Sequence, residues 1–302
     1  LDGDDHPQVP PDPASVAPER AGSQVGNVLD DSAFLYTGDN PIQTGVAPGT
    51  IELLRAALLR GKVMTRSGIP LPGATLTILN HPEFGSTLSR ADGMYDLAVN
   101  GGGPLTVNLD APGYLPAQRT IEVPWQEYVV IDDVALIPLD PIMTSIDLES
   151  PGDMKVARGS LSGDSDGMRR ATILFPQGVS AELRMPDGTT EPISDLTVRA
   201  TEFTLGEMGP EAMPGILPPT SAYTYAVELS VDQALAQGAV SVDFDQPIPT
   251  YVENFLGFPA GTPVPTGWYD RTKAAWVPAP DGVVIKILSE TGGLADLDVD
   301  GD

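Results

Sequence analysis

The chain has 302 residues, 41% of them hydrophobic, which is enough for more than one domain core. It carries 42 acidic against 16 basic residues, and this net charge of −26 is repelled by nucleic acid and by anionic membrane surfaces. The absence of cysteine excludes disulfides and thiolate metal sites. The sequence contains no run of about 18 apolar residues, the length that would predict a membrane span. We therefore expect no nucleic acid partner and no membrane insertion.

Glycine and proline shape the expected architecture. The 32 glycines and 31 prolines predict many short elements separated by turns. We expect an all-β fold with two consecutive β-sandwich domains preceded by an extended Pro-rich arm. The predicted division is an arm over 1–57, a compact β-sandwich over 58–139, a larger β-sandwich over 140–290 and an Asp-rich junction over 291–302.

The first 57 residues form the predicted arm. "HPQVPPDPASVAPERAG" is too rich in proline for a helix or a central strand. Phe34, Leu35 and Tyr36 are a small apolar anchor, and "IELLRAALLR" could form one or two helical turns. An ordered arm of this composition must lie against its own domains or against a neighbouring copy.

Residues 58–139 show the period of two that is typical of strands. "ATLTILN" alternates, and Asp92-Gly93 within "STLSRADGMYDLAV" is a strong hairpin signal. Leu105, Val107 and Leu109 point to one face. About seven such strands, with no helical stretch between them, indicate a sandwich.

Residues 140–290 predict a second series of strands, from "MKVARGSL" to "VVIKILS". Asp187-Gly188 and Asp281-Gly282 predict turns, as does "SGDSDG". "VDQALAQG" is the one convincing helical turn, and "GEMGPEAMPGILPPTS" predicts a packed surface loop.

No catalytic constellation is evident in the sequence, and we do not expect an enzyme. The only histidines are His6 in the Pro-rich arm and His81 in the turn "NHPEFG", where Glu83 is close enough for a local contact. Carboxylates are so numerous that no glycosidase pair can be singled out. Catalysis by a carboxylate pair or by His81 stays open as a lesser hypothesis.

The three tryptophans bear on ligand binding. Trp268 and Trp276 flank a tight hairpin and are expected to pack across its strands, as core or rim. Stacking of a sugar on Trp125 or Trp268 is the alternative, and it would require an exposed aromatic platform.

The strongest chemical signal is "DLDVDGD" at the C-terminal end of the sequence. Alternate aspartates before a glycine resemble the opening of an EF-hand calcium loop, whose oxygens surround a hard cation. The candidate calcium ligands are Asp296, Asp298, Asp300 and Asp302, with a weaker equivalent at Asp2 and Asp4. The closing ligand of such a loop would lie beyond residue 302, and a solvated acidic linker is the alternative.

Two resemblances follow from these motifs. "RGKVMTRSGIPLPGATLTI", "STLSRADGMYDLAV" and "VNLDAPGYLPAQRTIEV" resemble the carboxypeptidase regulatory-like, transthyretin-like module, which implies a non-catalytic β-sandwich. Roughly residues 30–302, with "FLYTGDNPIQTGVAPGTI", "GWYDRTKAAWVP" and "GGLADLDVDGD", resemble the region upstream of the repeats in bacterial RHS/YD-repeat proteins. Those proteins, like the related teneurins and toxin-complex shells, build a large β-cage.

The second resemblance implies a structural module of a large surface or toxin protein, located outside the cell or on the bacterial cell surface. Such a module would brace or plug the repeat cage, or mediate assembly, including assembly into a surface filament. Its partners would be the rest of a longer RHS-type polypeptide or neighbouring copies. The sequence contains no YD repeats and no toxin tip, and a glycan- or receptor-binding adhesin module is the alternative.

Overall fold

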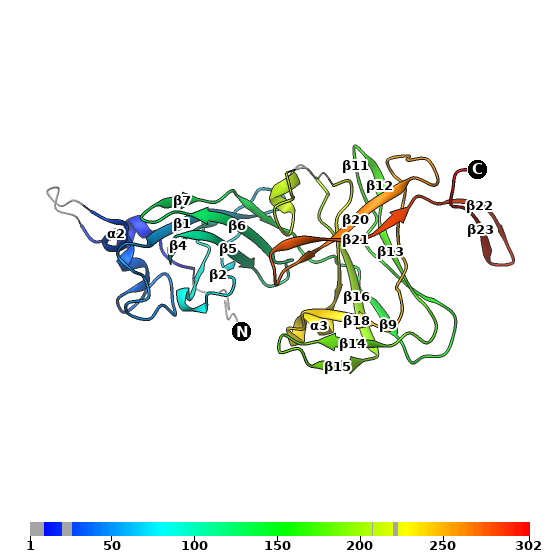
Figure 1. Ribbon diagram of the computed structural model, residues 1–302, viewed down its shortest axis with the longest axis horizontal. Helices are drawn as coiled ribbons and strands as arrows, with labels where there is room; N and C mark the ends of the chain where they lie inside the picture. Colours follow the sequence, from blue (N-terminus) through cyan, green and yellow to red (C-terminus); the bar gives the residue numbers. More distant parts are fainter. Residues whose placement is uncertain (1–8, 20–25, 207, 220–222) are drawn as a thin grey trace, which may run out of the picture. The chain divides into compact units, whose positions relative to one another are not determined.

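The computed structural model describes residues 9–19, 26–206, 208–219 and 223–302. Strands dominate it, which confirms the predicted all-β class with consecutive sandwiches (Figure 1). The chain divides into two compact units. The first comprises Leu1–Pro138, Glu207–Ala222 and Tyr269–Trp276, and the second comprises Leu139–Gly206, Tyr223–Trp268 and Val277–Asp302.

The first unit is a sandwich of two four-stranded sheets. One has the order β4-β1-β7, with β8 also paired to β1, and the other has the order β3-β2-β5-β6. Strand β1 is antiparallel to β4 but parallel to β7 and β8. The elements are α1 (Pro13–Val16), α2 (Val28–Tyr36), β1 (Ala56–Thr65), β2 (Thr75–Ile78), η1 (Pro82–Phe84), β3 (Ser86–Leu88), β4 (Met94–Asn100), β5 (Gly103–Asp110), β6 (Ala117–Val123), β7 (Tyr128–Val130), β8 (Val134–Leu136) and η2 (Gly209–Ala212).

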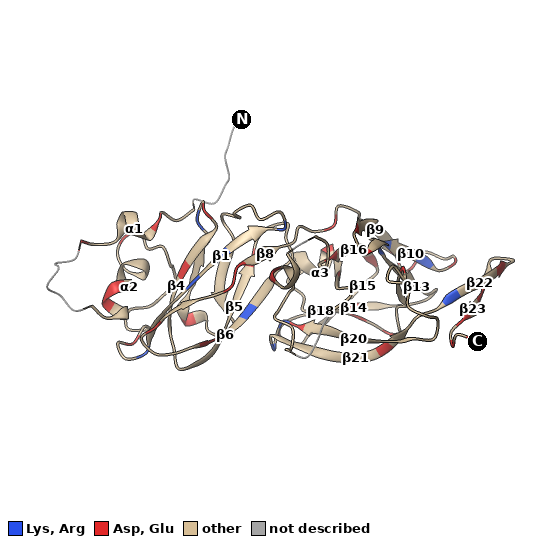
Figure 2. Cartoon of the chain, turned by 90° about the horizontal axis from the view of Figure 1, so that it is seen from above, with Lys and Arg blue, Asp and Glu red and all other residues tan. Residues whose placement is uncertain are grey.

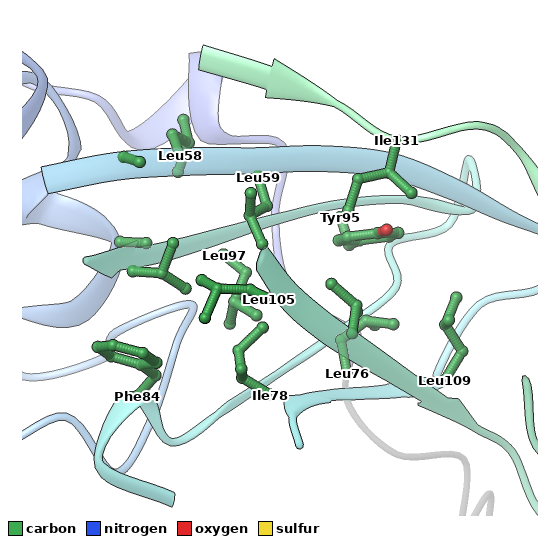
Figure 3. Close-up of a cluster of buried hydrophobic side chains, with 14 of the residues drawn as sticks. Leu58, Leu59, Leu76, Ile78, Phe84, Tyr95, Leu97, Leu105, Leu109 and Ile131 are labelled. Atoms are coloured by element: carbon green, nitrogen blue, oxygen red, sulfur yellow. The ribbon is translucent and has the colours of Figure 1, made fainter. Parts of the chain in front are cut away.

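Alternating apolar residues form the core of this sandwich. Leu105, Val107 and Leu109 of β5 are all buried on one face, as their spacing predicts. Figure 3 shows Leu105 and Leu109 in one layer with side chains from β1, β2 and β4, including that of Tyr95. Gly61 of β1 leaves room for this tyrosine, because a Cβ atom there would lie 2.5 Å from the Tyr95 Oη.

The segment before β1 differs from the extended arm that we expected. Asn27 caps α2 by accepting a hydrogen bond from the Asp30 N–H, and the helix buries Val28 and Leu35 in the core of the first sandwich. The Pro-rich stretch also contains the single turn α1, where Asp12 is the cap and Pro13 occupies the first helical turn. Proline at that position removes an N–H that has no partner within a helix.

The stretch "IELLRAALLR" contains one helical turn and then a strand. The Ala56 N–H donates to the Glu52 carbonyl at 2.8 Å, after which β1 begins. Burial of Ala57, Leu58 and Leu59 between α2 and the core outweighs the helical propensity of the leucines.

The second unit consists of short sheets around its own core. Its three-stranded sheets have the orders β10-β13-β19, β15-β14-β18 and β17-β16-β9. Its paired strands are β11-β12, β22-β23 and β20-β21, the last without the hairpin end Tyr269–Trp276, which belongs to the first unit. The elements are β9 (Thr144–Asp147), β10 (Lys155–Arg158), β11 (Ser162–Asp164), β12 (Gly167–Arg169), β13 (Ala171–Phe175), β14 (Ala181–Arg184), β15 (Thr190–Ile193), β16 (Asp195–Glu202), β17 (Val227–Val231), α3 (Asp232–Gln237), β18 (Ser241–Phe244), β19 (Thr250–Val252), β20 (Pro263–Asp270), β21 (Ala275–Val283), β22 (Lys286–Thr291) and β23 (Leu294–Asp298).

Several local predictions for this part of the chain can be compared with the structure. The helix over "VDQALAQG" is confirmed as α3, and "SGDSDG" is the turn of the β11-β12 hairpin. The predicted turn at Asp281-Gly282 is wrong, because both residues lie inside β21. In the predicted loop "GEMGPEAMPGILPPTS", Met213 is buried and belongs to the first unit, which agrees with a packed surface loop.

Candidate functional site

His81 lies in the turn between β2 and β3. Its Nδ1 is 2.9 Å from Glu83 Oε1, and its ring stacks on Phe84 with the centroids 5.5 Å apart. The hydrogen bond with His81 lowers the pKa of the Glu83 carboxyl. These contacts are local to the turn, as we expected for this histidine, whereas His6 lies outside the described residues.

Two shallow cavities bear on the enzyme hypothesis. The larger has a volume of about 430 Å³ and is lined by Ile142, Thr144, Val156, Arg158, Gly159 and Arg170. The smaller, about 300 Å³, is lined by Thr65, Arg66, Ser67, Tyr114 and Pro138. Neither lining includes a carboxylate or a histidine, so neither cavity offers a paired general acid and base.

The predicted calcium ligands lie at the end of β23. Asp296 and Asp298 are opposite Ser289 and Lys286 in the β22-β23 hairpin, and Asp300 and Asp302 follow the strand. The Asp298 Oδ1 accepts hydrogen bonds from the N–H groups of Asp300 and Gly301, at 3.2 and 2.7 Å. This carboxylate therefore closes a turn directly after the strand.

These aspartates do not converge on a point. Within the described ranges, no group of three or more Asp, Glu or His side chains is arranged so that it could hold a metal ion. Asp2 and Asp4 lie outside the described residues. The calcium hypothesis therefore rests on the sequence spacing alone.

The tryptophans have different environments. Trp276 is half-buried, and its ring partner is Tyr269, edge-on at 5.3 Å, rather than Trp268. Trp268 is 52% exposed. Trp125 is 60% exposed, and its indole lies over Gly102, where a Cβ atom would come within 2.3 Å of the indole nitrogen. Two of the three tryptophans thus present much of their surface to solvent.

Trp125 belongs to a larger exposed apolar area of the first unit. The turn before β1 (residues 53–55) and the segment 125–130, which ends in β7, lie side by side, because the Gln126 N–H donates to the Ala56 carbonyl at 2.8 Å and Leu58 is the register partner of Tyr128. Every large apolar side chain in these two segments that is at least half exposed belongs to this area. We call it the β7 surface: Leu53, Leu54, Trp125, Tyr128 and Val130.

Sequence reasoning did not find this surface. Leu53 and Leu54 lay in a stretch with helical potential, and Val130 lay in "YVVIDDVALIP", one of the about seven strands predicted for the first sandwich. Strand β7 instead ends its sheet, so its side chains meet fewer neighbours. The parallel pairing of β7 with β1 joins residues about seventy positions apart and has no local signal.

Two ion pairs with a buried carboxylate connect the strands near this surface. Asp96 of β4 is completely buried and accepts a hydrogen bond from the Arg60 Nε at 2.6 Å. Its second oxygen accepts from Arg90, whose side chain is 8% exposed. The carboxylate thus compensates two guanidinium groups across β1 and the β3-β4 turn.

A second buried arginine holds the inserted loop of the first unit. Arg119 of β6 donates to the carbonyls of Gln118, Met213 and Glu211, at 2.7, 3.1 and 2.7 Å. Burial lowers the pKa of its guanidinium, because the surroundings disfavour the charged form. Carbonyl oxygens therefore take the role that a carboxylate usually plays beside a buried arginine.

In the second unit, Arg169 is the corresponding ionic centre. It donates to both oxygens of Asp164, at 2.8 and 2.7 Å, and to Glu202 at 2.7 Å, while its guanidinium lies 4.5 Å from the centroid of the Phe255 ring. These bonds lower the pKa of Asp164 to about 2. The arrangement connects the β11-β12 hairpin to β16 and is structural in character.

Comparison with known proteins shows that the first sandwich is similar to a described family. Residues 51–136 match the family described as "Teneurin TTR-like domain". Over 120 residues the chain is 31% identical to Teneurin-4 of Homo sapiens, and over 109 residues it is 36% identical to Teneurin-1 of Gallus gallus. These alignments cover 40% and 35% of the chain but only 4% of each relative.

Similarity to solved structures is low. A structure of catechol 1,2-dioxygenase from Acinetobacter sp. ADP1, inhibited by bound mercury, aligns with a TM-score of 0.25 and 13% identity. That alignment covers 31% of the chain and 56% of the dioxygenase, a likeness too weak to support any inference from that enzyme. The sequence matches carry the assignment: residues 51–136 form a transthyretin-like β-sandwich of the teneurin type.

Proposed function

We propose that this chain is a non-catalytic structural or adhesion module of a large extracellular protein. The observation that carries the proposal is the match of residues 51–136 to the teneurin TTR-like domain. The alignment covers only 4% of the teneurin relative, which is a much larger protein. In the described part of the chain, no helix is long and apolar enough to cross a membrane.

The finer proposal is that the chain lies upstream of a YD-repeat cage of the RHS type and braces or plugs it. Exposed apolar side chains of the second unit support this role, since uncovered apolar surface often marks a contact with other protein. They include Met168, Leu256, Phe258, Trp268 and Ile287, all at least 40% exposed. Assembly of neighbouring copies, for instance into a filament, would use the same property.

Hydrogen exchange in the natural full-length polypeptide tests this proposal. Amides around Leu256–Phe258 and Trp268 are expected to exchange more slowly there than in the isolated 302-residue chain, because the cage would cover them. Residues of the α3 helix, including the exposed Leu235, provide an internal comparison. Equal exchange rates at all these places in both proteins would contradict the bracing role.

Calcium at the Asp-rich end is a further part of the proposal. Its support is the sequence spacing, by which Asp296, Asp298, Asp300 and Asp302 would supply the oxygen ligands. Calorimetric titration of the chain with calcium should show binding that Asp300→Asn weakens and that Asp187→Asn, in another exposed turn, leaves unchanged. Identical titrations of both variants and of the wild type would contradict it.

A glycan- or receptor-binding adhesin module is the second candidate. It is favoured by the exposure of Trp125 with Tyr128 nearby on the β7 surface, because aromatic faces are common in such sites. Binding to immobilised oligosaccharides, compared between the wild type and Trp125→Ala, tests it directly.

A further inference from the structure

The outer edge of β7 is a strand edge next to an exposed apolar surface. We propose that it is a docking edge for an extended segment of a separate polypeptide that carries alternating apolar and basic side chains. The segment would add to the β4-β1-β7 sheet as a further strand. This inference does not depend on a role in a repeat cage.

The backbone of β7 supplies the first argument. The Leu58 N–H donates to the Glu127 carbonyl at 3.0 Å, and the Ile131 N–H donates to the Arg60 carbonyl at 2.8 Å. Because peptide groups alternate in direction along a strand, those of Tyr128 and Val130 point away from β1. Strand β7 ends the order of its sheet, so these N–H and C=O groups form an open edge in the described part of the chain.

The side chains beside this edge supply the second argument. Tyr128 and Val130 are 57% and 74% exposed, while Val129 between them packs against the core. They belong to the β7 surface together with Leu53, Leu54 and Trp125, and the Gln126 side chain joins the two segments by donating to the Leu54 carbonyl at 3.5 Å. An added strand could bury its own apolar side chains here while its backbone completes the sheet.

Charge identifies the occupant. Glu127 precedes β7 and Asp132 and Asp133 follow it, all three exposed, and the Tyr128 Oη donates to the Asp31 carboxylate of α2 at 3.5 Å. Figure 2 shows acidic positions in red on α2. The two exposed cations beside the surface are both already paired: Arg55 with Glu52 at 3.3 Å, and Arg60, the register partner of Val130, with Asp96 at 2.6 Å. An acidic border around an apolar edge favours a basic, apolar strand.

The same charge argues against a second copy of this chain as the occupant. Two copies would bring two acidic borders together, and each chain carries a net charge of −26. Like charges placed face to face oppose association and suppress such a pairing.

A short synthetic strand tests the proposal on the intact 302-residue chain. The probe is a dye-labelled eight-residue peptide that alternates lysine and valine and is blocked at both ends, followed by fluorescence anisotropy. A peptide that alternates glutamate and valine is the charge control and should bind at least about tenfold more weakly. Binding of the lysine peptide should weaken as salt is raised, because screening reduces the attraction.

Three variants separate strand addition from other modes of binding. Val130→Pro removes an outward N–H but no bond to β1, so the fold should persist while peptide affinity falls about tenfold or more. Trp125→Ala should weaken binding by removing apolar contact area. Ile69→Ser is the matched control, because Ile69 is 61% exposed in the turn at the other end of β1. The affinity of the Ile69→Ser variant for the lysine peptide should stay within about twofold of the wild-type value.

Each contrary result has a distinct meaning. Equal affinity of wild type and Val130→Pro, or equal binding of the two peptides, would overturn the proposal. Dimerisation in sedimentation that Val130→Pro abolishes would show that a second copy is the occupant, and this too would overturn it. Oligosaccharide binding that depends on Trp125 but survives Val130→Pro, without binding of the lysine peptide, would replace the docking edge with a glycan platform.

Discussion

At the scale of single residues, the buried carboxylate of Asp96 is expected to matter more than its exposed neighbours. It lies between Arg60 and Arg90 with no exposure of its own side chain. Asp96→Asn removes the buried counter-charge of Arg90 and leaves only the exposed Asp92 nearby, and should lower the free energy of unfolding by about 3–5 kcal/mol. Urea unfolding followed by circular dichroism measures this change.

Asp92→Asn is the matched control for that substitution. Asp92 lies 3.7 Å from the same Arg90, but its side chain is 59% exposed, and an asparagine can still accept the hydrogen bond from the Met94 N–H. Its effect should stay below about 1 kcal/mol. An equal decrease of the free energy of unfolding in Asp96→Asn and Asp92→Asn would mean that the burial of Asp96 adds nothing to the stability that its ion pairs provide.

Asp164 should make the stability of the second unit depend on pH. Its pKa is lowered to about 2 by Arg169, below that of an aspartate in an unfolded chain. The stabilisation is therefore complete above about pH 4 and is lost as the pH falls towards 2, where the folded carboxylate takes up its proton. The stability difference between the wild type and Asp164→Asn should narrow over this range.

Unfolding in urea at several pH values between 6 and 2 measures that difference. Asp166→Asn serves as the comparison, because Asp166 lies in the same turn and the described bonds of Arg169 do not include it. If the difference in the free energy of unfolding between the wild type and Asp164→Asn did not change with pH, the ion pair with Arg169 would not be the source of the stabilisation.

At the scale of elements, the bridge between Thr44 and Ser86 attaches the segment before β1 to β3. Gly85 permits this approach, since it has φ +61° and a Cβ atom there would lie 1.8 Å from the Thr44 carbonyl oxygen. Gly85→Ala must therefore separate the two segments. We expect the free energy of unfolding to fall by more than about 3 kcal/mol, because the backbone is strained and the bridge is broken.

Gly49→Ala separates strain from contact. Gly49 has φ +84°, but nothing lies within 4 Å of its Cβ position, so only the cost of the left-handed backbone remains, about 1–2 kcal/mol. Thermal unfolding of both variants gives the comparison. A Gly85→Ala variant no less stable than Gly49→Ala would show that the bridge adds little.

The success of sequence reasoning depended on how local each signal was. Alternation predicted the buried face of β5, because it depends on neighbouring residues. Asp92-Gly93 does form a turn before β4, but the predicted hairpin is wrong, because β3 pairs with β2 and β4 pairs with β1 in another sheet. The helix α2 was missed because its glycine- and proline-rich surroundings suggested coil, whereas its stability comes from burying Val28 and Leu35. The β7 surface and the bonds of Arg119 connect distant segments, and no local pattern encodes them.

At the scale of the whole molecule, charge and exposed apolar surface act in opposite directions. The net charge of −26 keeps chains apart, while apolar side chains such as Val130 and Leu294 remain exposed. A chain with both properties favours association with partners that bring positive charge or that belong to the same polypeptide. Both proposals made above are of this kind.

The same net charge predicts how stability responds to salt. Repulsion among 42 acidic side chains opposes the folded state, and added salt screens it, since the Debye length falls from about 30 Å at 0.01 M to about 8 Å at 0.15 M. The Tm should therefore rise between these sodium chloride concentrations and rise equally in potassium chloride. A flat or falling Tm would mean that surface ion pairs such as Arg184–Asp243 outweigh the repulsion. At the same ionic strength screening is held constant, so a further rise of the Tm with calcium would indicate specific binding, as proposed for Asp296, Asp298, Asp300 and Asp302.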